Sequence, residues 1–146
     1  MEISSPDFKN GERIPSKFSC DGESVNPTLL ISGVSESAQS LALIMDDPDA
    51  PIGTFTHWIL FNIDPKTEKI KENSVPVGAR QGRNSGGKVG YYPPCPPSGT
   101  HRYFFKLYAL DEKLELGNGA RLEELERAMK GHIIEKAEII GLYSRS

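Results

Sequence analysis

Three segments of the chain combine aliphatic and aromatic residues and are bounded by turn-forming residues. They cover Leu41–Asp47, Phe55–Ile63 and His101–Leu110. Such residues fit the pleated, half-buried surface of a sheet, and the Gly, Pro and Asp residues around them favour turns. The whole chain contains 14 Gly and 11 Pro, which favours short strands and structured loops over a helical bundle. The sequence therefore predicts a mainly β protein with one domain, residues 1–146, since this length suits a single hydrophobic core.

Two further elements are expected in the C-terminal third. Leu122, Leu125 and Met129 recur at helical spacing, and they predict a helix over about Arg121–Lys130 that packs against the sheet. A short strand is expected at Ala137–Tyr143. Residues 64–100 instead form a long connection rich in Gly and Pro, and such a loop inside a compact domain is usually functional or disordered.

Charge and hydropathy exclude several classes of protein. The net charge is -3, and no basic stripe of the kind that binds nucleic acid is present. No apolar run approaches the ~18 residues that a membrane-spanning helix needs. The N-terminus has neither the basic region nor the apolar region of a signal peptide, so a cytoplasmic location is expected.

The two cysteines, Cys20 and Cys95, fit no zinc motif by their spacing. In a reducing cytosol two free thiols are the simpler interpretation. A disulfide between them remains an alternative, because proteins of hyperthermophiles are an exception to that rule.

Each of the three predicted strands becomes polar at one end of an apolar face. Alternation places Asp47 at the end of the first strand, His57 on the face of Ile59 in the second, and His101 with Tyr103 at the start of the third. If the first strand runs antiparallel to the other two, these ends coincide. The result would be an apolar slot with convergent polar groups, the usual form of a ligand site. The alternative is that each polar residue merely ends its strand.

The residue types suit an anion. Imidazoles and a phenol can donate hydrogen bonds to phosphate or carboxylate oxygens. Asp47 is expected to accept an N–H from a histidine and so to fix its tautomer, and Arg102 to pair with Asp49. A zinc site built from His57, His101 and Asp47 is a further possibility, but no metal in stoichiometric amount is expected.

Two strings resemble a known family. DPDAP at residues 47–51, followed by His57-Trp58, and PCPPSGTHRY at residues 94–103 are similar to the phosphatidylethanolamine-binding protein family, also called the Raf kinase inhibitor protein family. The bacterial and archaeal branch matches best, over nearly the whole chain. The pair Tyr92-Pro93 departs from the Gly-Gly that is common in this branch, which would reshape the pocket rim.

The resemblance implies a β fold of two antiparallel sheets with one or two peripheral helices, and a pocket that accepts phosphate-like anions without a cofactor. The chain ends soon after Tyr143 and lacks the C-terminal extension of the animal proteins, so Raf kinase inhibition is not carried over. The candidate ligand-binding residues are Asp47, Asp49, His57, Cys95, Pro96, His101 and Tyr103.

Three functions are compatible with these residues. The first is a binding protein with a rigid pocket for a small anion or a phosphorylated headgroup, acting as a regulator rather than an enzyme. The second is an inhibitor of a serine protease or a kinase, which an exposed stiff loop would contact. The third is a hydrolase using Cys95 with a histidine, but no G-x-S-x-G string occurs and prolines flank the cysteine. The physiological ligand and the oligomeric state are left open.

Overall fold

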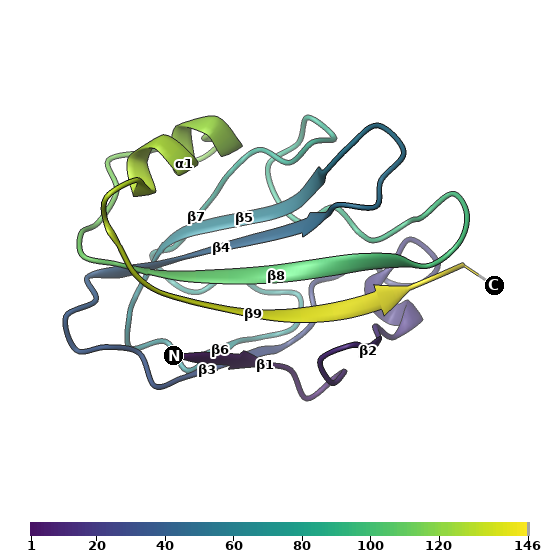
Figure 1. Cartoon of the computed structure of the whole chain (residues 1–146), viewed down its shortest axis with the longest axis horizontal. Coiled ribbons are helices and arrows are strands. Elements are labelled where there is room, and N and C mark those ends of the chain that lie inside the picture. Colours follow the sequence, from purple (N-terminus) through teal and green to yellow (C-terminus); the bar gives the residue numbers. More distant parts are fainter. Residues whose placement is uncertain (146) are drawn as a thin grey trace.

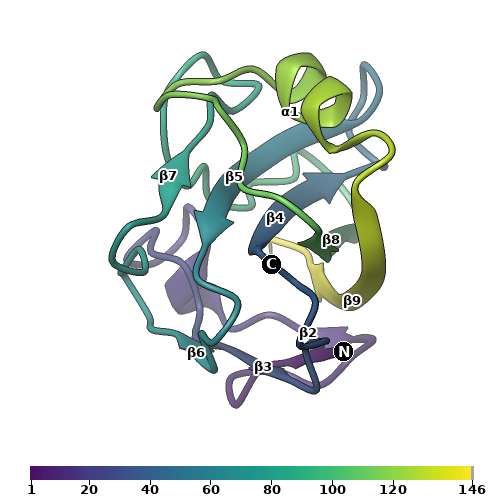
Figure 2. The same cartoon turned by 90° about the vertical axis from the view of Figure 1, so that its left-hand side faces the viewer.

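The computed structural model describes residues 1–145, which form two facing sheets and one helix (Figure 1). Helix α1 lies on the outer face of the large sheet, and the small sheet lies on the opposite face (Figure 2). The elements in chain order are β1 (Glu2–Ser4), β2 (Glu12–Arg13), the 3-10 turn η1 (Ser16–Phe18), β3 (Leu29–Ser32), β4 (Ser40–Asp47), β5 (Phe55–Ile63), β6 (Lys69–Ile70), β7 (Arg80–Gln81), β8 (His101–Leu110), α1 (Leu122–Met129) and β9 (Ile133–Tyr143).

The small sheet has the strand order β1-β3-β6, and the large sheet has the order β2-β9-β8-β4-β5-β7. Strand β4 runs antiparallel to both β5 and β8, as the convergence of polar strand ends requires. The mainly β fold with two sheets is thereby confirmed. One detail differs, because β2 pairs parallel with β9 through Glu12 and Arg13, so the large sheet is mixed.

The predicted strands match the structure closely where the apolar pattern is strong. Strands β5 and β8 have the predicted bounds, and β4 begins one residue earlier. Strand β9 begins at Ile133, four residues before the predicted start, because its first half pairs with β8 although its side chains are largely exposed. Helix α1 is shorter by one residue at each end than predicted.

Two hydrophobic cores hold the layers together. The larger core lies between the two sheets and contains Leu43, Met45 and Trp58 of the large sheet with Leu29 and Ile31 of the small one. The smaller core lies under α1, where Leu125 and Met129 contact the outer face of the large sheet. With eight residues α1 is too short to cross a bilayer, and no other helix within residues 1–145 is long and apolar enough to do so.

The outer ends of the long strands bring two loops together. The loop between β4 and β5 and the loop before β8 meet at the right-hand end of the molecule in Figure 1. These loops contain the DPDAP and PCPPSGT residues that were singled out in the sequence.

Candidate anion-binding site

A cavity of about 260 Å³ opens where β4 ends and where β5 and β8 begin. Six of the seven candidate residues line it. The lining consists of Asp47, Ala50, Pro51, Phe55, His57, Tyr92, Cys95, Pro96, Pro97, His101 and Tyr103.

Asp47 and His101 form a buried pair at the cavity wall. The Nδ1–H of His101 donates to Oδ2 of Asp47 over 2.6 Å, and the other oxygen of Asp47 accepts the backbone N–H of Asp49 over 2.8 Å. Because a carboxylate only accepts, this geometry fixes the hydrogen on Nδ1 and leaves Nε2 of His101 for a ligand. Asp47 therefore acts on the histidine, as predicted from the sequence.

Asp49 lies outside the cavity lining. Its carboxylate accepts two bonds from the guanidinium of Arg102 and one from the Arg102 backbone N–H, each of 2.9 Å. These bonds lower the pKa of Asp49 to about 2. The structure thus shows the Asp49–Arg102 pair expected from the sequence, and it gives Asp49 the role of fastening β8 to the β4–β5 loop.

His57 reaches the cavity through an irregularity in β5. Met45 pairs with Trp58 while the next residue, Asp46, pairs with Thr56, so His57 is an extra residue in a β-bulge. A bulge turns a side chain away from the face that simple alternation gives it, and bulges are frequent beside functional sites. The expectation that His57 shares the face of Ile59 is wrong, since Ile59 lies in the core under α1 whereas His57 lines the cavity.

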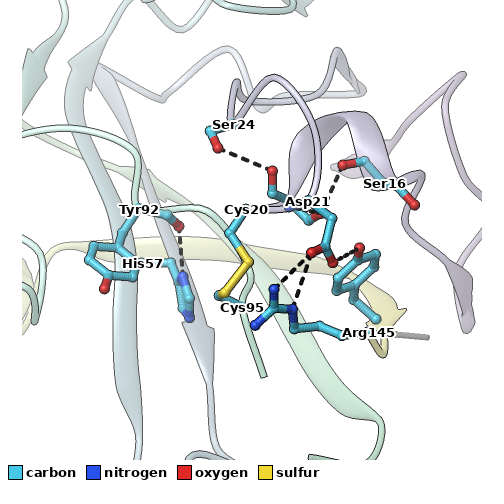
Figure 3. Close-up of a disulfide and its surroundings, with 10 residues drawn as sticks. Ser16, Cys20, Asp21, Ser24, His57, Tyr92, Cys95 and Arg145 are labelled. Atoms are coloured by element: carbon cyan, nitrogen blue, oxygen red, sulfur yellow. Dashed lines mark hydrogen bonds and ion pairs between the residues drawn. A yellow bond between two sulfur atoms is a disulfide. The ribbon is translucent and has the colours of Figure 1, made fainter. Parts of the chain in front are cut away.

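His57 and Tyr92 exchange two hydrogen bonds. The backbone N–H of Tyr92 donates to the carbonyl of His57 over 2.8 Å, and Nδ1 of His57 donates to the carbonyl of Tyr92 over 2.7 Å (Figure 3). Burial lowers the pKa of His57, although the bond to Tyr92 opposes this effect. His57 is therefore a neutral imidazole whose Nε2 carries a lone pair.

Aromatic rings surround the two histidines. Tyr103 is fully buried, and its ring centroid lies 5.2 Å from that of His57. Burial, followed by the charge of Asp47, raises the pKa of Tyr103, so this phenol keeps its proton and can donate it to an acceptor. Phe55 packs between His57 and Tyr92, with centroid distances of 4.7 and 4.9 Å.

Cys95 lines the cavity as one half of a disulfide with Cys20 (Figure 3). The expectation of two free thiols is wrong for this structure, because the 3-10 turn and the loop before β8 bring the two Cα atoms to 5.4 Å, a distance that a disulfide spans. Pro96 follows as a buried wall residue.

Several lining residues were not predicted from the sequence. Pro51, Phe55 and Pro97 are apolar wall residues, and Tyr92 was noted only as a departure from a family pattern. Phe55 could have been identified from its position, because it pairs directly with Asp47 across β4 and β5. Among residues 1–145, no group of three or more His, Cys, Asp or Glu is arranged to hold a metal ion.

A larger hollow of about 930 Å³ lies elsewhere, between residues 30–38 and residues 65–68. It contains no histidine, and its charged lining residues are Glu36, Lys66 and Glu68. The smaller cavity is the better candidate because it gathers the buried titratable groups.

The chain is similar in sequence to known proteins. A sequence model described as phosphatidylethanolamine-binding protein matches residues 4–144. A UPF0098 protein of Pyrococcus abyssi is 53% identical over 94% of this chain and 82% of its own length, and one of Methanothermobacter thermautotrophicus is 49% identical over 99% of both.

Two crystal structures superpose closely. A phosphatidylethanolamine-binding protein homologue of Chlamydia trachomatis has a TM-score of 0.96 at 42% identity, covering 99% of this chain and 97% of its own. Escherichia coli YbcL, described as a member of the mammalian PEBP family, has a TM-score of 0.92 at 30% identity over 99% and 98% of the two chains.

Proposed function

Because the chain belongs to the phosphatidylethanolamine-binding protein family, we propose that its cavity binds a small anion or a phosphorylated headgroup and that the protein is a regulator rather than an enzyme. The observation that carries the proposal is the meeting of His57, His101 and Tyr103 around one cavity, with both Nδ1 atoms committed to protein acceptors. The Nε2 atoms of His57 and His101 make no hydrogen bond within residues 1–145.

The protonation of these groups decides which anions fit. Tyr103 donates in its protonated form, whereas His57 and His101 accept at Nε2 when neutral and donate when protonated. A phosphate monoester that keeps one proton can donate it to one histidine and accept from another group. A fully ionised anion requires proton uptake by a histidine, and the imidazolium of His101 would then lie between Asp47 and the ligand.

The walls accommodate an organic group attached to the anion. Pro51, Phe55 and Pro97 are apolar, and Ile52, on the same loop as Pro51, is fully exposed. A phosphorylated ligand with an apolar portion would therefore contact both parts of the site.

A Cys–His hydrolase is disfavoured, since a cysteine held in a disulfide offers no thiolate nucleophile.

A titration of ¹⁵N-labelled protein with inorganic phosphate, O-phosphoethanolamine and a nucleoside monophosphate tests the proposal. Saturable shifts confined to residues 47–57 and 92–103 are expected. The His101→Asn variant should weaken binding at least about tenfold, because the amide replaces Nδ1 toward Asp47 but nothing replaces Nε2. His132→Asn is the matched control. His132 pairs with Asp111 just beyond the end of β8 and β9 that lies opposite the cavity. Equal affinity of the two variants would contradict the proposal.

Inhibition of a serine protease is a second candidate, favoured by one observation. Ile52 is fully exposed on a loop that Asp49 and Arg102 fasten at its base. An exposed aliphatic side chain on such a loop can enter a protease specificity pocket. Inhibition of an elastase-like protease that is lost in Ile52→Asp would support this function, whereas unchanged inhibition would exclude Ile52 as the contact.

A further inference from the structure

The segment of residues 95–100 forms part of the cavity wall but has little to hold it. Before it, Tyr92 exchanges hydrogen bonds with His57, and the hydroxyl of Tyr91 donates to the carbonyl of Phe18 over 2.8 Å. After it, Arg102 is fastened to Asp49. Within residues 1–145 no hydrogen bond joins residues 95–100 themselves to another part of the chain, and the prolines in this loop have no N–H to donate.

The disulfide is the covalent tether of this wall. It joins Cys95 to Cys20, and only one hydrogen bond accompanies it, from the backbone N–H of Cys20 to the carbonyl of Pro94 over 3.0 Å. Cleavage of the S–S bond therefore leaves residues 95–100 without a covalent or hydrogen-bonded link to another part of the described chain, so that the packing of the buried Pro96 has to hold the segment.

The other end of the tether is fixed. Ser19 is buried, and its hydroxyl donates to the carbonyl of Ser16 and accepts the N–H of Asp21. The carboxylate of Asp21 in turn accepts bonds from Tyr143 and Arg145. Asp21 and Arg145 lie beside the disulfide in Figure 3. A change at the disulfide is consequently expected in the cavity wall rather than around Cys20.

The two cysteines of the disulfide differ in exposure. Cys95 is exposed, whereas Cys20 is half-buried. Thiol–disulfide exchange requires a thiolate to reach one sulfur and displace the other. The exposure favours attack at Cys95, with Cys20 leaving as the thiolate.

We propose that Cys20–Cys95 is a redox-active disulfide that sets the affinity of the anion cavity, with a dithiol as its reductant. One thiolate of the dithiol bonds to the Cys95 sulfur as the Cys20–Cys95 bond breaks. The second thiol then attacks this mixed disulfide, so that both cysteines end as thiols and the dithiol ends as a disulfide after transfer of two electrons and two protons. The inference rests on the proposed function for its ligand, but its effect on the wall can be measured without ligand.

The test compares oxidised protein with protein reduced by dithiothreitol. Without ligand, the heteronuclear NOE of Ser98, Gly99 and Thr100 is expected to fall on reduction, while the amides of β4 and β8 keep their shifts. Phosphate affinity is expected to weaken about fivefold or more on reduction, because several loop residues must then become ordered when phosphate binds. The Cys20→Ser, Cys95→Ser double variant should behave like the reduced protein with or without dithiothreitol.

Three results would overturn the inference: unchanged loop dynamics on reduction, loss of order throughout β4 and β8, or equal phosphate affinity in both redox states. Absence of phosphate binding by the oxidised protein would instead contradict both the proposed function and the effect of the disulfide on affinity. The heteronuclear NOE measurement would still decide whether the disulfide holds the cavity wall.

A brief reaction with glutathione gives an independent readout, because the mixed disulfide should map to Cys95. Its recovery on Cys20 would contradict the direction of exchange.

Discussion

His57 is the residue at which the proposed anion binding is expected to be linked to protonation. His57 is buried, its burial lowers its pKa, and its Nδ1 donates to the Tyr92 carbonyl. An acceptor-only anion has no favourable interaction with the lone pair on Nε2. Binding of such an anion therefore favours the imidazolium and is linked to proton uptake.

Sulfate affinity should consequently rise as the pH falls. Burial lowers the pKa of His57 below its ordinary value of 6.5, so His57 of the free protein is neutral at neutral pH, whereas it is expected to be protonated in the complex. The observed association constant should increase by up to about tenfold per pH unit until His57 of the free protein is itself protonated. Calorimetry in buffers of different ionisation enthalpy measures the proton uptake.

The His57→Asn variant is the control for this linkage, because the amide can still donate to the Tyr92 carbonyl but cannot take up a proton. Its sulfate affinity should depend less steeply on pH than that of the unmodified protein. Sulfate affinity that is the same from about pH 8 to about pH 5 would contradict a linked histidine.

At the scale of the elements, regular strands were predictable and irregular ones were not. The apolar pattern identified β4 and β5, which are buried on both faces over most of their length, and β8, whose buried residues alternate with exposed and half-buried ones. The bulge at His57 left no such signal, since one extra residue changes the pairing and not the composition. Short strands such as β1 and β6 depend on their pairing partners, and sequence spacing does not reveal these.

The loop that carries Gly86 sets the position of Tyr92 at the cavity rim. A Cβ on Gly86 would lie 2.5 Å from Cε2 of the Tyr92 ring, so Gly86→Ala should displace that ring. Phosphate affinity is expected to change severalfold, whereas the free energy of unfolding should change by less than about 1 kcal/mol because Gly86 and Tyr92 are exposed. Gly117→Ala is the matched control, since a Cβ there meets open space. Equal phosphate affinity in the two variants would show that Tyr92 does not shape the site.

At the scale of the whole molecule, the disulfide connects the N-terminal segment to the cavity across 75 residues of sequence. The sequence left this pairing open, because the distance between two cysteines in the fold depends on long-range packing. The site residues were easier to predict, since Asp47, His101 and Tyr103 follow the alternation of regular strands. Asp49 is the exception, because its carboxylate pairs with Arg102 and it does not line the cavity.

Reduction is also expected to lower global stability. A cross-link that closes a loop of this length stabilises a fold by roughly 4 kcal/mol through restriction of the unfolded chain. Guanidinium unfolding of the oxidised and the reduced protein at one pH measures the difference. An equal free energy of unfolding in both states would show that the cross-link does not restrict the unfolded chain.

We propose that His57 and His101 together bind an anion in one cavity. This proposal is tested most directly by ¹⁵N spectra of protein labelled only at its three histidines, recorded while inorganic phosphate is added. We expect the Nε2 resonances of His57 and His101 to shift and saturate at the same phosphate concentration, while those of His132 stay unchanged. Shifts of equal size at all three histidines, or no saturable shift at His57 and His101, would contradict it.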